Sequence, residues 1–163
     1  MGVSGAGKTT VGAALAARLG AEFLDADDFH PAENVAKMSA AIPLSDADRW
    51  PWLDRLNGEL AARQAAGRGA VLACSALKEI HRSRLMQGLD GPQLVHLQGS
   101  IEFIRERMKT RKHKYMPAAL LTSQFETLEP PRDAVLVDAA LEVPAAVERI
   151  AAELARKDPA RKP

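Results

Sequence analysis

Hydrophobic residues recur along this chain with two alternating periods, one typical of helices and one typical of strands. Val11, Leu15 and Leu19 are spaced by four residues and precede Gly20, which predicts an amphipathic helix with a glycine C-cap. Short segments between the helical patterns read as strands, and the first of them ends in carboxylates. They cover residues 22–27, 70–74, 93–98 and 134–138.

Three further segments have helical periodicity. Leu53, Leu56 and Leu60 share one face, and this helix is predicted to start near Trp50, because an interior Pro51 would cost about 3 kcal/mol. A second helix is expected at 100–111, with Ile101, Ile104 and Met108 inward, and a third is opened by Pro144. Strands that alternate with helices predict a three-layer α/β/α fold around a parallel sheet, whose ligands bind at the carboxyl ends of the strands.

Composition limits the classes of function. The 163 residues, 47% of them hydrophobic, suit one domain, expected at 1–156 with a frayed tail at 157–163. A net charge of +1 gives no reason to expect a nucleic-acid or membrane partner, and small-molecule chemistry is the default. A single cysteine, no apolar run of membrane-spanning length and no recognisable signal peptide favour a cytoplasmic protein.

The strongest motif stands at the start of the chain. Gly2, Gly7, Lys8 and Thr9 fit G-x-x-x-x-G-K-[ST], a loop whose backbone amides surround nucleotide phosphates. Lys8 would neutralise charge during phosphoryl transfer, and the Thr9 hydroxyl would coordinate Mg²⁺. The residues assigned to ATP in this stretch are Gly2, Val3, Ser4, Gly5, Ala6, Gly7, Lys8, Thr9 and Thr10.

Carboxylates follow the first predicted strand. Alternation along that strand would send Asp25 and Asp27 to the same side, where one holds the Mg²⁺ water shell and the other accepts a hydroxyl proton from a substrate. The alternative is that this acidic run only caps a helix.

Two basic stretches are candidate anion sites. Ser75 is expected to cap a helix that presents Lys78 and Arg82 on one face, a seat for an anionic substrate group. Arg107 and Arg111 share a helical stripe with Phe103 that runs into a basic segment, read as a cover over the phosphates of ATP. Solvated basic faces are the alternative for both. Without N-K-x-D or D-x-x-G motifs a GTPase is excluded, which leaves a small ATP-dependent kinase.

These motifs resemble the thermoresistant-type gluconokinases, which are P-loop small-molecule kinases related to shikimate kinase. The resemblance covers nearly the whole chain. It is carried by "GVSGAGKT", "FLDADDFHP", Asn34 with Lys37 and Met38, "PLSDADRWPWL", "CSALK" and "LLTSQFETLEPP".

The resemblance implies transfer of the ATP γ-phosphoryl group to the 6-hydroxyl of D-gluconate, with Mg²⁺, a lid at about 112–131 and commonly a homodimer. It also implies that Asp25 lies near Mg²⁺ and that a set of polar and charged residues faces the sugar acid. That set is Asp27, His30, Arg49, Lys78 and Arg82.

The chain departs from the family pattern in two places. Ala41 stands where a glycine is usual, which removes easy access to positive φ, and we expect a slightly reshaped loop with activity retained. The lid reads "HKYMP" at 113–117 instead of "GHFMP", and Lys114 would replace the positive charge of the histidine. The alternatives are a shikimate- or nucleoside-monophosphate-type kinase and a truncated chain with impaired nucleotide binding.

Only Met1 precedes the phosphate loop, which normally follows a buried strand. Four or five lost apolar side chains, at ~1.5–3 kcal/mol each, are comparable to the whole stability of a domain. We therefore expect the natural protein to begin upstream with an apolar strand. The residues printed here should fold with a gap in the sheet where that strand belongs.

Overall fold

A computed structural model describes residues 1–40, 42–110 and 118–157. In chain order its elements are α1 (Lys8–Leu19), β1 (Glu22–Asp25), the 3-10 helix η1 (Ala26–Phe29), α2 (Ala32–Ser39), α3 (Asp46–Ala65), β2 (Ala70–Ala73), α4 (Glu79–Met86), β3 (Val95–Gln98), α5 (Ile101–Thr110), α6 (Ala118–Thr127), β4 (Val135–Asp138) and α7 (Val143–Lys157).

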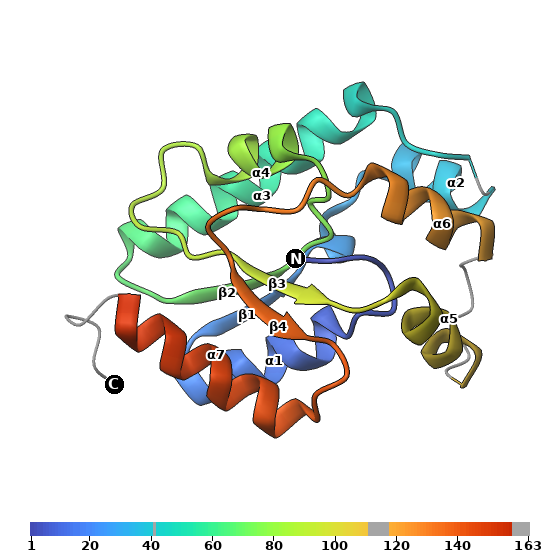
Figure 1. The fold of residues 1–163 in the computed structure, drawn as a ribbon. Helices are drawn as coiled ribbons and strands as arrows, with labels where there is room; N and C mark the ends of the chain where they lie inside the picture. The colour runs from blue at the N-terminus through green and yellow to red at the C-terminus, as the bar shows by residue number, and fades with distance from the viewer. Residues whose placement is uncertain (41, 111–117, 158–163) are drawn as a thin grey trace.

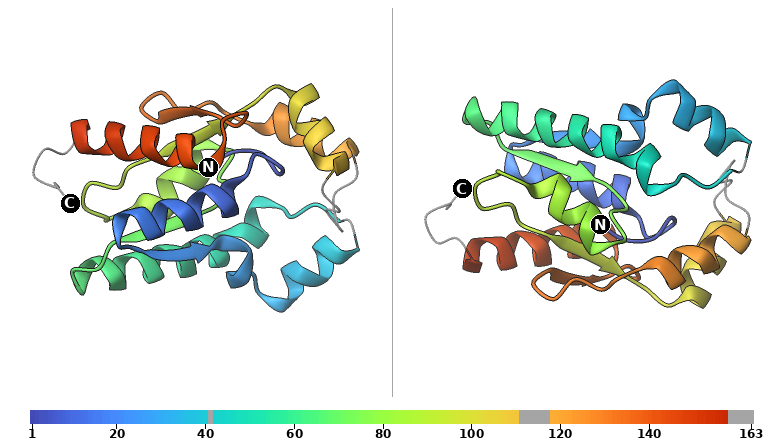
Figure 2. Two further views of the ribbon diagram at one scale, coloured as in Figure 1. Left: turned by 90° about the horizontal axis from the view of Figure 1, so that it is seen from below. Right: turned by 90° about the horizontal axis from the view of Figure 1, so that it is seen from above.

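The strands form two parallel pairs between two layers of helices. β1 pairs with β2, with Asp25 opposite Ala73, and β3 pairs with β4, with Gln98 opposite Asp138. Helices α1 and α7 lie on one side of the strands, and α3 and α4 lie on the other (Figure 1). The views from below and above show these helix pairs in front of the strands (Figure 2). The three-layer α/β/α architecture with parallel strands is therefore confirmed.

The first residues of the chain lie between the two strand pairs. The Met1 amine donates to the Val95 carbonyl (2.5 Å), the Leu97 amide donates to the Met1 carbonyl (3.0 Å), and the Gly2 amide donates to the Ser75 carbonyl (3.4 Å). Within the described residues no ladder of strand pairing joins the two pairs. This is the gap in the sheet that the sequence predicts.

Two apolar clusters hold the layers together. The larger one lies between α1, α5, α7 and the β3–β4 pair, and Ile104 and Ile150 are fully buried in it. The smaller one lies under α3 and α4, where Leu53 and Leu56 are fully buried against Leu85. The inward faces predicted for the helices at 100–111 and after Pro144 are correct. In the described part of the chain, no helix combines the length and apolar content needed to cross a membrane.

Helix α3 begins earlier than the sequence suggested. The Ser45 hydroxyl accepts from the Asp48 amide, and the Asp48 carboxylate accepts from the Ser45 amide, which is a complete capping box. The prediction of a start near Trp50 is therefore wrong, and Pro51 lies inside the helix. The capping box starts the helix before Pro51, whose missing amide then removes one intrahelical bond in the second turn.

Cys74 follows β2 in the smaller cluster, and burial raises the pKa of its thiol to about 11. At pH 8 only about one thiol in a thousand is then ionised, and the thiolate is the reactive form. We expect iodoacetamide to leave the native protein unmodified over an hour and to add one group once guanidinium unfolds it. Intact-mass spectrometry reports both states. Stoichiometric labelling of the folded protein would contradict this burial.

Candidate active site

The phosphate loop begins at the N-terminus and leads directly into α1 (Figure 1). Gly7 is the N-cap of α1 with φ 98°, and Gly5 has φ 82°, values that glycine adopts without strain. A Cβ on Gly5 would lie 2.8 Å from Met108 Cγ of α5. The glycines therefore allow the loop to turn under α5 and to present backbone amides at the start of a helix, an arrangement suited to phosphate.

Lys8 is half-buried beside this loop. Its Nζ donates to the carbonyl of Val3 at 3.0 Å, which folds the side chain back across the loop. Burial lowers the pKa of the Lys8 ammonium, while the carboxylates of Asp27 and Asp25 act in the opposite direction. The lysine and the acidic turn after β1 thus interact electrostatically.

Thr9 and Asp25 join the loop to that acidic turn. The Thr9 hydroxyl donates to Asp25 Oδ2 at 2.8 Å, although the two residues come from different elements. A hydroxyl and a carboxylate are ligands suited to Mg²⁺, which in kinases takes one or two protein oxygens and completes its shell with water and phosphate. No cluster of three or more His, Cys, Asp or Glu side chains suited to a metal occurs in the described residues.

The acidic turn differs from the predicted strand. The strand ends at Asp25, whose Oδ1 accepts from the Asp27 amide at 3.1 Å and so caps the 3-10 helix η1. The predicted strand at 22–27 is therefore too long, and strand alternation does not set the direction of Asp27, which lies in η1. Asp27 is exposed at the carboxyl end of β1, and its charge is felt at Lys8 and His30.

Arg107 of α5 lies over the loop. Its guanidinium atoms are 3.5–3.8 Å from the position that a Cβ on Gly7 would occupy. Nη1 donates to the Ala139 carbonyl at 2.7 Å, and the guanidinium carbon is 5.9 Å from the centre of the Phe103 ring. Phe103 and Arg107 of the predicted stripe lie together, and Arg107 brings a cation to the loop at Gly7.

Asp46 of α3 pairs with two basic residues at the start of α4. Lys78 Nζ lies 3.0 Å from Asp46 Oδ2, and His81 Nε2 lies 3.0 Å from Asp46 Oδ1. Burial lowers the pKa of His81, which favours the neutral imidazole, and the bond to Asp46 opposes that shift. Lys78 is the N-cap residue of α4 in an extended conformation, so the prediction that Ser75 caps this helix is wrong.

Arg82 is 5% exposed and supports the turn before α4. Its Nη1 donates to the carbonyls of Ala76 (3.1 Å) and Leu77 (2.8 Å). Ala76 has φ 40°, a left-handed conformation that is unfavourable for a residue with a side chain. The guanidinium thus holds a strained turn. The prediction that one helix carries both Lys78 and Arg82 on one face is wrong, because Lys78 precedes the helix; Arg82 lies within it and is buried.

Arg49 and His30 line the same region from α3 and the end of η1. Arg49 is half-buried, with Nη2 3.4 Å from the Leu44 carbonyl. His30 stacks on Trp52 with ring centroids 4.2 Å apart, and its Nδ1 has no hydrogen-bond partner among the described residues. Burial lowers the pKa of His30 more than the nearby Asp27 charge raises it. At neutral pH this imidazole is therefore uncharged.

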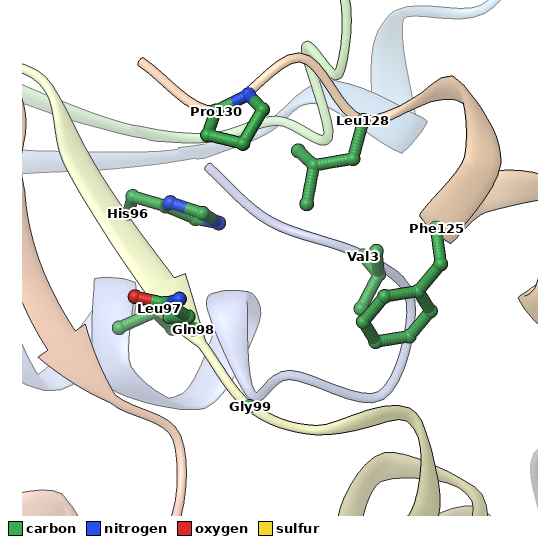
Figure 3. Close-up of a pocket in the computed structure, with 8 residues that line it drawn as sticks. All are labelled: Val3, His96, Leu97, Gln98, Gly99, Phe125, Leu128 and Pro130. Carbon is green, nitrogen blue, oxygen red and sulfur yellow. The ribbon is translucent and has the colours of Figure 1, made fainter. Parts of the chain in front are cut away.

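A small cavity of 160 Å³ lies beside the first residues of the loop. Figure 3 shows the His96 ring, from β3, directed into the space below Pro130 and Leu128, with Val3 and Phe125 on the other side. His96 is 3% exposed, and its Nδ1 has no partner in the part of the chain that the structure describes. The sequence assigned His96 no function, and its surroundings are largely apolar.

This geometry agrees with the comparisons with known proteins. A family model described as an AAA domain matches residues 1–131. A probable gluconokinase of Xenopus tropicalis is 44% identical over 175 residues, which cover 96% of this chain and 92% of that protein. A gluconokinase of Gluconobacter oxydans (strain 621H) is 50% identical over 134 residues, covering 82% and 75%. The chain belongs to the gluconokinase family.

The fold leads to the same family. A crystal structure of a gluconokinase from Sinorhizobium meliloti 1021 matches with a TM-score of 0.87 at 44% identity and covers 96% of this chain and 90% of that one. The resemblance seen in the motifs is thereby confirmed. Both of these departures from the gluconokinase pattern, at Ala41 and in the lid at His113 and Lys114, lie outside the described residues. Arg111 and the first part of the predicted lid lie outside them as well.

Sequence reasoning gave no role to the contacts that tie α2 to α3, although Asn34 and Lys37 are among the residues that carry the family resemblance. Lys37 Nζ lies 2.6 Å from Asp48 Oδ1, and the Asn34 amide donates to the Asp48 carbonyl, so α2 is tied to the first turn of α3. The Lys37 ammonium holds the pKa of Asp48 down at about 2. Asp48 was visible in "PLSDADRW", and its capping-box spacing from Ser45 could have identified its role at the start of α3.

Proposed function

We propose that this chain transfers the γ-phosphoryl group of ATP to the 6-hydroxyl of D-gluconate and so forms 6-phospho-D-gluconate. The identity of the acceptor is supported by relatives named gluconokinase that match most of the chain. The observation that carries the chemistry is the 2.8 Å bond between Thr9 Oγ1 and Asp25, because it joins a phosphate-binding loop to an acidic turn. Phosphoryl transfer needs both.

The donor side is assigned to the loop and to α5. The amides of Gly2–Thr10 would hold the β- and γ-phosphates, with Arg107 above Gly7 and Arg111 further along the same stripe. Lys8 would leave the Val3 carbonyl and follow the charge that builds on the γ-phosphoryl oxygens. Thr9 and Asp25 would hold Mg²⁺, directly or through water. The ion, when bound, neutralises phosphate charge.

On the acceptor side, Asp27 is assigned as the general base. Its exposed carboxylate would accept the proton of the 6-hydroxyl as that oxygen bonds to the γ-phosphorus. The bond from phosphorus to the bridging oxygen breaks in the same step, and ADP takes that electron pair. Residues around the β2–α4 turn and α3 would bind the sugar acid. They are His30, Arg49, Lys78 and Arg82.

Among these residues, Lys78 offers the clearest test of how the carboxylate of gluconate is bound. Its ammonium is half-exposed and already paired with the Asp46 carboxylate, so it can exchange one carboxylate for another. We expect Lys78→Ala to raise the KM for gluconate by about 10–100-fold, the loss of a charge-assisted hydrogen bond, and to leave the KM for ATP nearly unchanged.

The control for Lys78 is Lys157→Ala, which removes the same charge at the end of α7, where Lys157 donates only to the Asp133 carbonyl among the described contacts. Steady-state kinetics with each substrate varied in turn gives both constants. A parallel rise in the KM for ATP would assign Lys78 to the phosphates or to the fold.

We also propose the domain organisation, the oligomeric state and the cellular compartment of this kinase. Residues 1–156 would form one kinase domain, with a lid at about 112–131 whose described end is α6. The protein would act in the cytoplasm, as a homodimer, on a small molecule without nucleic acid or membrane.

A screen of acceptors tests this function against its alternatives. ADP release from ATP and Mg²⁺ is measured with gluconate, other aldonic acids, shikimate and nucleoside monophosphates at equal concentrations. We expect gluconate to give the highest kcat/KM. A higher value for shikimate or a nucleotide would move the chain to another small-molecule kinase. If the protein fails to bind ATP at millimolar concentration, the alternative of a truncated chain with impaired nucleotide binding would be favoured.

A further inference from the structure

The end of α6 and the turn after it contact both sides of the site. Gln124 Oε1 accepts from the Ser4 amide of the phosphate loop at 2.7 Å. Five residues later, the Glu129 amide donates to the Leu77 carbonyl at 3.0 Å. We call residues 124–129 the strap. It runs from the donor loop to the turn that carries Lys78 (Figure 1).

Glu129 provides a cap for α4 from a distant part of the chain. Its Oε2 accepts from the amide of Glu79, the first residue of α4, at 2.5 Å. Lys78, the N-cap residue, makes no capping bond with its own side chain. Because the first amides of a helix have no partner within it, the Glu129 carboxylate satisfies a donor that the local sequence leaves unpaired. The cap fixes the backbone on the C-terminal side of Lys78.

The turn that Glu129 contacts is strained and held from both sides. Ala76 is in the left-handed conformation, and the Leu77 carbonyl accepts from both the Arg82 guanidinium and the Glu129 amide. A residue in such a conformation persists only where its surroundings hold it there. Arg82 provides this support from α4 and Glu129 provides it from the strap.

The strap also borders the cavity beside the first residues of the phosphate loop. The 160 Å³ cavity lies between it and β3, lined by Phe125 and Leu128 of the strap and by His96 (Figure 3). Phe125 and Leu128 also pack against the larger apolar cluster. The loop and the turn are otherwise joined by the bond from the Gly2 amide to the Ser75 carbonyl, which is 3.4 Å long. The hydrogen bonds of Gln124 and Glu129 therefore set the spacing of the two sides.

We propose that Gln124 and Glu129 are positioning residues for phosphoryl transfer. The strap holds the acceptor-binding turn at a fixed distance from the phosphate loop, so that the acceptor hydroxyl meets the γ-phosphorus in line. Neither side chain touches the reacting atoms in this role. Reaction rates depend steeply on such alignment, so small displacements of the turn are costly. This inference rests on the proposed gluconate kinase function.

The test compares Glu129→Ala, Glu129→Gln and the control Glu126→Ala. Glu126 is exposed in the last turn of α6, which ends before Glu129, and no contact involves its side chain in the described structure. We expect Glu129→Ala to raise the KM for gluconate about tenfold and to lower kcat about tenfold, with the KM for ATP within about twofold. Glutamine keeps an acceptor oxygen for the Glu79 amide, so Glu129→Gln should stay within about threefold of the unmodified protein.

Hydrogen exchange of the peptide covering residues 75–82 gives a second readout that needs no turnover. We expect faster exchange there in Glu129→Ala than in Glu126→Ala. The proposal is overturned if Glu129→Ala behaves as Glu126→Ala, if both KM values rise equally, or if glutamine fails to rescue. A protein without gluconate kinase activity would refute the proposed function instead. The rate of hydrogen exchange at residues 75–82 would then test whether the strap holds the turn. An exchange rate in Glu129→Ala equal to that in Glu126→Ala would overturn the proposal.

Discussion

Lys8→Ala is expected to lower kcat by ~10²-fold or more, beyond any loss of affinity for ATP. The reason is that the ammonium is proposed to act on charge present chiefly in the transition state, and such an interaction appears in kcat. In the structure Lys8 Nζ is held on the Val3 carbonyl, within the field of Asp27 and Asp25, so it lies at the loop before a nucleotide arrives. Initial rates at saturating ATP and gluconate measure this effect.

The control for Lys8 is Lys109→Ala. Lys109 is an exposed lysine of α5 that pairs with Glu106, and its removal changes the net charge equally. We expect this variant to keep normal turnover. Near-normal kcat in Lys8→Ala, with ATP bound, would contradict the assignment of the phosphate loop.

Asp27→Asn is expected to lower kcat by ~10²–10³-fold while both substrates still bind. An amide of the same shape cannot take the proton of the 6-hydroxyl, and general base catalysis contributes about this factor. The backbone amide of residue 27 still donates to the Asp25 carboxylate, so η1 and its cap are preserved. Kinetics with each substrate varied separates the loss of kcat from the two KM values.

Asp28→Asn is the matched control, since Asp28 is exposed on the same 3-10 helix and carries the same charge. It should behave as the unmodified protein. Equal losses in the two variants would mean that the acidic turn acts through its overall charge, and Asp27 would no longer be the base.

The architecture could be predicted from sequence because each element has a local signal. The glycine after Leu19 adopts φ 62° and ends α1 as expected, and the apolar spacing of α7 places Val147 and Ile150 in the core. The start of α3 was predicted too late because the cost of an interior proline was weighed and the Ser45–Asp48 capping box was not. The end of β1 was missed because Asp25 caps η1, a competition between side chain and strand that alternation does not reveal.

The site was predictable on its donor side and less so on its acceptor side. The phosphate loop is contiguous in sequence, so its residues could be named from the motif. Lys78 and Glu129 have partners in distant segments, Asp46 of α3 and the first amide of α4. Arg82 bonds back to the strained turn at Ala76, just before its own helix. Spacing along one segment carries no information about such contacts. For this reason Arg82 was placed with Lys78 on one helical face, whereas Lys78 precedes the helix and Arg82 is buried in it.

The most direct test of the account is to follow both products of the reaction with gluconate. ADP is measured by one coupled assay, and a dehydrogenase specific for 6-phospho-D-gluconate reports the second product from the same mixture. We predict one 6-phospho-D-gluconate for each ADP, with the rate dependent on Mg²⁺ and abolished in Lys8→Ala. ADP formed without 6-phosphogluconate, or no ADP with gluconate present, would contradict the central claim that this chain phosphorylates gluconate at its 6-hydroxyl.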